Sequence, residues 1–189
     1  MEQEELERLL EGREETQTFE VKCRMPWDVK NLARDILAMA NVRDGGTILI
    51  GVVDKTFARE GVDAVTKATY KPDVMRDQLA TYADPHVLVT VHFPFDSKGT
   101  EYVAIRVHPF RELPVICKCD SKDTKAGAIY YRTTNRRPQS AAINNSYDLR
   151  DLIMTAVARV GEGLSRLGLQ ITSTTSDFTQ QLDTELEGL

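Results

Sequence analysis

The sequence predicts a mixed α+β fold, in which helices flank a mostly antiparallel sheet of about five to six strands. Short runs of alternating or continuous apolar residues, typical of strands, lie between longer segments whose apolar residues recur at helical spacing. The segment "DSKGT" joins two of the strand-like runs and indicates a hairpin turn. A chain of 189 residues, of which 41% are hydrophobic, is suited to one domain with an ordinary core.

The first half of the chain supplies two predicted helices and two predicted strands. Residues 1–12 carry a narrow leucine stripe that ends near Gly12, which predicts a short helix. Residues 18–23 alternate between apolar and polar side chains, as in a strand with one polar face. A helix over 28–41 follows, and the apolar run 47–53 is typical of a fully buried strand.

The second half is richer in strands. We expect a helix over 72–82, strands over 87–95, 101–107, 114–119 and 128–132, and a last helix over 147–167. These elements form one domain over residues 1–168. The remaining residues, 169–189, lose strong periodicity and are interpreted as a tail or docking segment.

Composition excludes several classes of protein. No apolar run approaches the roughly 18 residues of a membrane span, and the acidic first helix is unlike a secretory signal. Three cysteines are too few for a disulfide framework, which favours a reducing, cytoplasmic setting. The net charge is −5, but the acidic residues gather at the two ends, so the body is mildly basic and compatible with a nucleic-acid partner.

Three carboxylates are candidates for a metal site. Glu20 lies on the polar face of the strand 18–23, Glu15 precedes that strand, and Asp54 follows the strand 47–53. Neighbouring strands would bring them around one pocket, where oxygen-only ligation favours Mn²⁺ or Mg²⁺. Lys22, on the same face as Glu20, would steady negative charge on a phosphate. The alternative is that the glutamates are solvated and Asp54 only starts a turn.

Basic residues with aromatic neighbours form a second candidate site, for nucleic acid. The run "YYRTTNRRPQS" contains Tyr131 and three arginines, and the preceding loop contains three lysines. Guanidinium and ammonium groups beside aromatic rings suit phosphate contacts and base stacking. The residues are Arg132, Arg136, Arg137, Lys118, Lys122 and Lys125. The alternative is that this cluster braces a turn between a strand and a helix.

Four segments in order resemble the Schlafen-type AlbA-like domain. They are "ETQTFEVK", "ILAMANVRDGGTILIGVVD", "EYVAIRVHPFRELPV" and "AIYYRTTNRRPQSA", within residues 10–155. The family carries Glu-Ser…Glu-Phe-Lys, then Ala-Phe-Ala-Asn…Gly-Gly, then Gly-Val-Asp-Asp. Here Val21 and Met39 replace phenylalanines, and Val53 replaces the first aspartate of the last motif.

The resemblance implies a nuclease. Schlafen nucleases cleave transfer RNA and other structured RNA with a metal-binding trio of two glutamates and one aspartate, which correspond to Glu15, Glu20 and Asp54, while Lys22 matches the lysine of Glu-Phe-Lys. RNA is therefore favoured over DNA as the partner. Eukaryotic members place two such lobes face to face, which implies a homodimer for a chain with one lobe.

Two alternatives to a metal-dependent endoribonuclease remain open from the sequence. Many bacterial members of the family are described only as DNA-binding domains fused to regulators, which implies a non-catalytic DNA-binding module. The acidic ends of the chain also suit a protein-interaction subunit.

Overall fold

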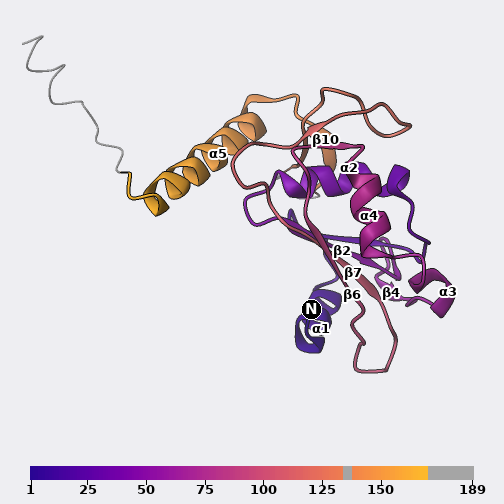
Figure 1. Cartoon of the computed structure of the whole chain (residues 1–189). Helices are drawn as coiled ribbons and strands as arrows, with labels where there is room; N and C mark the ends of the chain where they lie inside the picture. Colours follow the sequence, from indigo (N-terminus) through magenta and orange to yellow (C-terminus); the bar gives the residue numbers. More distant parts are fainter. Residues whose placement is uncertain (134–137, 170–189) are drawn as a thin grey trace, which may run out of the picture.

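The structure of the chain is a computed structural model that describes residues 1–133 and 138–169. Its helices and strands alternate irregularly along the chain (Figure 1). In chain order they are α1 (Gln3–Gly12), β1 (Phe19–Lys22), α2 (Val29–Ala40), β2 (Gly46–Ile50), β3 (Val52–Val53), β4 (Ala58–Arg59), α3 (Ala64–Lys67), α4 (Pro72–Leu79), β5 (Ala83–Asp84), β6 (Val89–His92), β7 (Val103–Val107), β8 (Ile116–Cys117), β9 (Tyr130–Arg132), β10 (Ser140–Ala142) and α5 (Ser146–Arg166).

The central sheet has four strands in the order β1-β2-β7-β6. β1 runs parallel to β2, whereas β2 pairs antiparallel with β7 and β7 antiparallel with β6. The remaining named strands form two-stranded sheets, β3 with β4, β5 with β8 and β9 with β10. This arrangement confirms the predicted mixed, mostly antiparallel α+β fold.

A glycine divides the long strand expected over 47–53 into β2 and β3. Gly51 has a φ of 105°, a conformation that side chains rarely adopt, and a Cβ there would lie 2.8 Å from the backbone of Gly61. Its N–H donates to the carbonyl oxygen of Lys22 at 2.9 Å, so the chain bends while β1 stays attached. The bend directs the residues after β3 back toward the end of β1.

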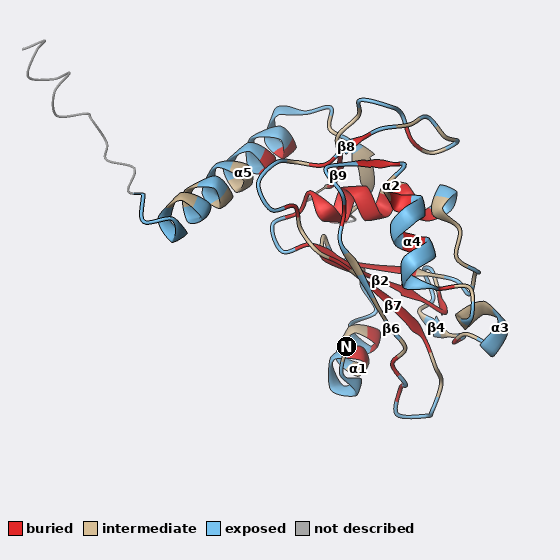
Figure 2. Ribbon diagram, in the orientation of Figure 1, coloured by how far each residue is buried: buried red, intermediate tan, exposed pale blue. Residues whose placement is uncertain are grey.

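Both faces of the sheet are covered (Figures 1 and 2). On one face Phe19 and Val21 of β1 pack with Leu6 and Leu10 of α1. On the other face α2 covers Ile48 and Ile50 of β2 and core residues of β7. Alternation in β1 therefore turns Glu20 and Lys22 toward α2, and Glu20 is only 7% exposed. The face predicted to be polar is polar but largely buried.

Four short elements have no counterpart among the predicted ones. They are α3, β4, β5 and β10, each of two to four residues. Segments of this length contain about one hydrophobic period and do not repeat it, so no pattern in the sequence marks them. β10 matters for the site, because it pairs with β9 and the two strands pack over α2.

The last helix, α5, confirms the helix predicted over 147–167. It extends away from the body, and most of its surface is exposed (Figure 2). Except for Leu169, the predicted tail over 169–189 lies outside the described residues. None of the helices in the described part of the chain is long and apolar enough to cross a membrane.

Candidate active site

A pocket of about 310 Å³ lies at the carboxyl end of β1, beside the residue that follows β3. β1 supplies Glu20 and Lys22, the segment before β1 supplies Glu15, and Asp54 reaches the same pocket from the residue after β3. The structure therefore brings together the four residues that the sequence predicted for the catalytic site.

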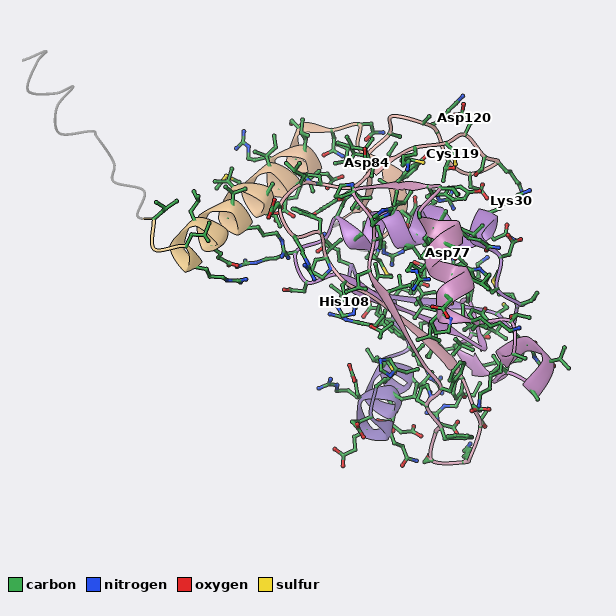
Figure 3. All side chains as sticks on the ribbon, in the orientation of Figure 1. Lys30, Asp77, Asp84, His108, Cys119 and Asp120 are labelled. Carbon is green, nitrogen blue, oxygen red and sulfur yellow. The ribbon has the colours of Figure 1, made fainter. Side chains whose placement is uncertain are left out.

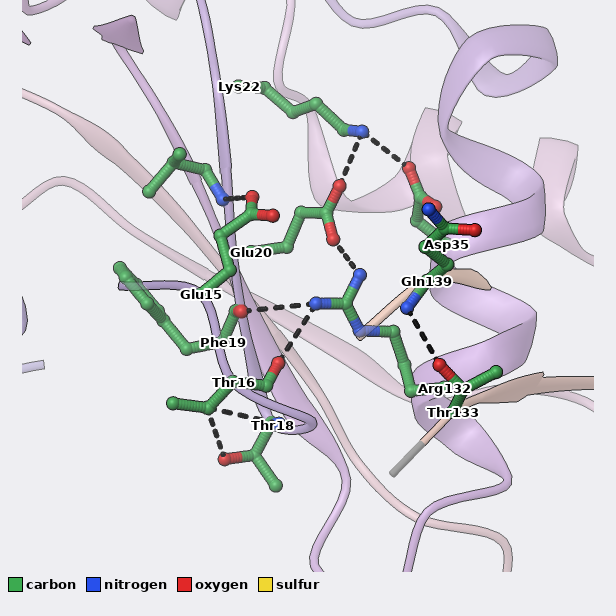
Figure 4. Close-up of polar contacts among 11 residues, drawn as sticks. Glu15, Thr16, Thr18, Phe19, Glu20, Lys22, Asp35, Arg132, Thr133 and Gln139 are labelled. Atoms are coloured by element: carbon green, nitrogen blue, oxygen red, sulfur yellow. Dashed lines mark hydrogen bonds and ion pairs between the residues drawn. The ribbon is translucent and has the colours of Figure 1, made fainter. Parts of the chain in front are cut away.

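Glu20 is held between two cations (Figure 4). Its Oε1 lies 2.7 Å from Nζ of Lys22, and its Oε2 accepts a hydrogen bond from Nη1 of Arg132. Lys22 Nζ also lies 2.8 Å from Oδ2 of Asp35 on α2. Arg132, Glu20, Lys22 and Asp35 thus form a chain of alternating charge, which we call the Glu20 network.

The other two carboxylates make local contacts. Glu15 accepts the backbone N–H of Val21 at 2.9 Å through Oε1, and Asp54, which is exposed, accepts the N–H of Lys55 at 2.7 Å. Within residues 1–133 and 138–169, no three His, Cys, Asp or Glu side chains lie close enough together to hold a metal ion. The trio shares a pocket, but its oxygens are not gathered around one point.

Arg132 lies inside the protein, with 1% of its surface exposed. Its Nη2 donates to the carbonyl oxygens of Thr16 at 2.9 Å and Phe19 at 3.3 Å, so it fixes the turn that leads into β1 (Figure 4). Burial lowers the pKa of the guanidinium, and the charge of Glu15 opposes this effect. Arg132 therefore braces the acidic pocket and the turn into β1, a structural role at a different place from the strand-to-helix turn of the alternative interpretation.

Tyr131 is also buried, at 2% exposure, and its ring offers no open face for a base. Its hydroxyl donates to Asp151 of α5 and accepts from Nε2 of Gln17 at 3.2 Å. Burial, with the neighbouring Asp151 carboxylate, raises the pKa of the Tyr131 hydroxyl. In the structure this residue joins α5 to the segment before β1.

The three lysines predicted to bind nucleic acid are exposed on the loop between β8 and β9. Lys118 donates to the carbonyl oxygen of Ala80 at 3.1 Å, and Nζ of Lys125 lies 3.9 Å from Oδ1 of Asp120. Lys122 is exposed on the same loop, whose Asp120 is labelled at one end of the molecule (Figure 3).

This loop contacts α2, where Oδ1 of Asp123 lies 3.8 Å from Nη1 of Arg34. Arg34 adjoins Asp35 of the Glu20 network in sequence. The loop over residues 118–129, which we call the lysine loop, therefore contacts α2, and the acidic pocket contacts the same helix through the ion pair of Lys22 with Asp35. Arg136 and Arg137 lie outside the described residues.

Asp35 was not predicted as a site residue from the sequence, although a signal was present. Asp35 is three residues after Leu32 and one before Ile36, on the side of α2 that faces the core, and it is 3% exposed. A carboxylate in such a position requires a cation or several hydrogen bonds. The polar face of β1, which contains Lys22, was the available source of that cation.

These observations define a class of protein: a mixed α+β domain with a carboxylate-lined pocket whose central glutamate is held by an arginine and a lysine. The model of the Schlafen AlbA_2 family matches residues 15–139, and the chain belongs to that family of nucleic-acid-related domains. The match contains the whole Glu20 network and the lysine loop.

The chain resembles the structure of the DIP2311 protein from Corynebacterium diphtheriae, with 18% sequence identity and a TM-score of 0.48. The similarity covers 71% of this chain and 23% of that chain. No curated protein matches the chain.

Proposed function

We propose that this protein is a metal-dependent endoribonuclease of the Schlafen type that acts on transfer RNA or other structured RNA. The observation that carries the proposal is the shared pocket of Glu15, Glu20, Lys22 and Asp54 within a domain of this family. Carboxylate oxygens suit Mn²⁺ or Mg²⁺, so the chemistry of the donor set fits such a cation, although the three side chains must move closer together to bind it. When bound, the cation would polarise the scissile phosphodiester.

The chain's own residues would hold and orient the reacting groups. Glu15, Glu20 and Asp54 would hold the cation, which requires side-chain movement, since Glu15 now binds the N–H of Val21. Arg132 would keep the Glu20 carboxylate in place through its buried contact. A carboxylate fixed in this way loses less freedom when it binds a ligand.

Lys22 would stabilise negative charge on the phosphate, and Asp35 would position it. The ammonium group is shared between Glu20 at 2.7 Å and Asp35 at 2.8 Å. When Glu20 turns to a cation, Asp35 still holds Lys22 at the pocket. Asp35 is therefore a positioning residue in the proposed reaction.

The substrate would meet the exposed loop that carries Lys118, Lys122 and Lys125, together with Arg136 and Arg137. Their positive charge would bind the phosphate backbone, with an affinity that falls as salt is raised. We further propose that RNA is preferred to DNA and that the protein acts in the cytoplasm as a homodimer.

A non-catalytic DNA-binding module is the second candidate, and a specific observation favours it. Both Glu20 oxygens already have cationic partners in Lys22 and Arg132, so a metal ion competes with two existing contacts. In this alternative the Glu20 network only stabilises the fold beneath a nucleic-acid surface.

Incubation of the protein with total transfer RNA, with Mn²⁺, with Mg²⁺ and with EDTA, distinguishes the two. Glu20→Ala is the obvious variant, but it leaves Arg132 buried without its carboxylate. Asp54→Asn is the better companion, because Asp54 is exposed and its loss leaves no buried charge. Asp77→Asn, on the exposed side of α4, is the matched control.

We expect discrete RNA fragments that require metal, Glu20 and Asp54 but not Asp77. Intact RNA in every lane, together with a retained gel shift, would refute cleavage and support the binding module. Circular dichroism of each variant confirms that it is folded.

A further inference from the structure

α5 carries large apolar side chains that its own domain does not cover. Val157 and Met154 are 60% and 61% exposed, Ile153 is 51% exposed, and Leu167 is 76% exposed. A soluble helix normally buries its apolar stripe against the core. Within the described part of the chain, the apolar faces of α1, α2 and α4 are buried in this way, whereas α5 buries only Leu152 among its apolar residues.

Most of these apolar residues follow the spacing of a coiled coil. Steps of three or four positions separate the members of a stripe that runs along α5 to its C-cap, which we call the α5 seam: the exposed Leu149, Ile153, Val157, Val160 and Leu167 and the half-buried Leu164. A repeat near 3.5 residues keeps one stripe facing a second helix. The occupant that fits this stripe is therefore another helix rather than a strand or a small ligand.

The seam is distinct from the stripe that attaches α5 to the body. That stripe consists of Leu152, Ala156 and Arg159, where Arg159 lies over the ring of Phe110 at 5.1 Å and donates to the carbonyl oxygen of Arg43. Seam residues come one position later in the chain, about 100° around the helix axis. A helix lying on the seam would not displace the body.

Two glycines beside the seam point to a close neighbour. Gly161 and Gly163 lie inside α5, where each costs about 1 kcal/mol relative to alanine. A Cβ on either would meet nothing within 4 Å, so no described part of the chain requires a glycine there. A second helix packed on the seam would favour glycine at these positions, because small residues let two backbones approach each other closely.

The composition of α5 favours a second copy of itself as that helix. α5 contains three acidic residues (Asp148, Asp151, Glu162) and three basic ones (Arg150, Arg159, Arg166), so two copies do not repel although the whole chain carries −5. In a two-fold pair the same patch lies on both partners, so the seam of one copy packs against the seam of the other. Within the described residues the seam is the open apolar helix face that is available for such a contact. Pairing would bury on the order of 1,000 Å², the lower range for a specific interface.

We propose that the α5 seam is a homotypic interface through which two copies of this chain pair as a two-stranded coiled coil. The inference identifies an interface for the homodimer proposed above, and it does not depend on RNA cleavage. A dimer joined at α5 can form whether the acidic pocket is catalytic or not.

The test is the mass of the full chain in solution, measured by multi-angle light scattering and sedimentation equilibrium at micromolar concentration. The seam variant is Val157→Glu with Val160→Glu, which adds charge at exposed positions and so preserves the fold. The matched control is Ala158→Glu with Ser165→Glu, which adds the same charge to the same helix at exposed positions off the seam.

We expect twice the 21.3 kDa chain mass for the wild type and for the control, and 21.3 kDa for the seam variant. The seam substitutions should raise the dimer dissociation constant by at least about 100-fold, since four carboxylates would face an apolar interface. Equal helix content by circular dichroism shows that α5 is intact in each variant.

A monomeric wild type overturns the proposal. This holds equally when the seam is covered within the monomer, by residues 170–189 or by another segment of the same chain. A dimer that forms equally well in the seam variant also overturns it, because the interface then lies elsewhere. RNA cleavage by each variant is a separate measurement, so failure of the interface and failure of the nuclease are distinguishable.

Discussion

Two ion-pair networks on opposite faces of the sheet satisfy their buried carboxylates in different ways. In the Glu20 network the carboxylate is held by side chains alone, those of Arg132 and Lys22. In the second network, which comprises Glu7, Arg59 and Asp96, the 2% exposed Asp96 accepts the backbone N–H groups of Lys98 at 2.9 Å and Thr100 at 2.8 Å.

The second network is structural. Glu7 of α1 binds Arg59 of β4 at 2.8 Å and the N–H of Ser97 at 2.6 Å, so it fastens the first helix to a strand and to a loop. None of its residues is among those that line the acidic pocket. A backbone donor cannot leave, whereas Lys22, with its side chain 28% exposed, can exchange one partner for another. Exchangeable partners at a pocket are what a ligand-binding carboxylate needs.

The largest expected effect follows from removing the buried cation of the Glu20 network. Arg132→Leu leaves the buried Glu20 carboxylate with Lys22 but without its buried cationic partner, and we expect a loss of about 3–5 kcal/mol in the free energy of unfolding. The measurement is urea denaturation at neutral pH. Arg59→Leu in the other network is the matched control, with an expected loss of about 1 kcal/mol, since the Arg59 side chain is 24% exposed and Asp96 keeps its backbone donors.

Equal losses in the two arginine variants would contradict the comparison. A further check is the double variant Arg132→Leu with Glu20→Leu. Replacing both charges should recover part of the stability, since an apolar pair of similar size leaves no unpaired charge.

A smaller effect, on activity, is expected from Asp35→Asn. The asparagine keeps the shape of the side chain but no longer attracts the Lys22 ammonium at 2.8 Å. We expect RNA cleavage to fall about tenfold in kcat with KM nearly unchanged, because the lysine is less well positioned when the phosphate becomes more negative. Single-turnover assays measure this, and Asp35→Glu should restore part of the rate.

An unchanged kcat in Asp35→Asn with normal stability would show that Asp35 does not position Lys22. A rise in KM alone would show instead that the residue affects binding only. Either result separates the positioning role from a purely structural one.

The pocket residues were predictable from the sequence to the extent that they are close in sequence. Glu15, Glu20 and Lys22 lie on or beside one strand, so spacing alone placed them together, and Asp54 follows the adjacent strand. Arg132 was predicted as a site residue that binds nucleic acid, but its buried contact with Glu20 was not predicted. It lies 112 positions from Glu20, and their contact depends on β9 and β10 packing over α2, which no local pattern reveals.

The remaining differences have equally physical causes. The burial of Glu20 depends on α2 covering the polar face of β1, and alternation in a strand does not tell which face is covered. The bend at Gly51 depends on its close approach to Gly61, again a contact distant in sequence. The long elements were predictable because each contains several hydrophobic periods, as in α2 and α5.

The smallest expected effect concerns Glu7, and it tests the structural character of the second network. Hydrogen bonds from Arg59 and Ser97 lower the pKa of Glu7 from 4.5 to about 2. A carboxylate with a lowered folded-state pKa stabilises the fold fully above its unfolded-state value, and the contribution is lost as the pH falls from 4.5 toward about 2. Glu7→Gln should therefore lower Tm at neutral pH and flatten its dependence on pH within that window, as measured by thermal unfolding followed by circular dichroism. Glu11→Gln, at an exposed position of the same helix, should leave that slope unchanged. If Glu7→Gln retains the wild-type slope, the acid sensitivity in this window comes from other carboxylates, and α1 is held by its leucines rather than by the ion pair.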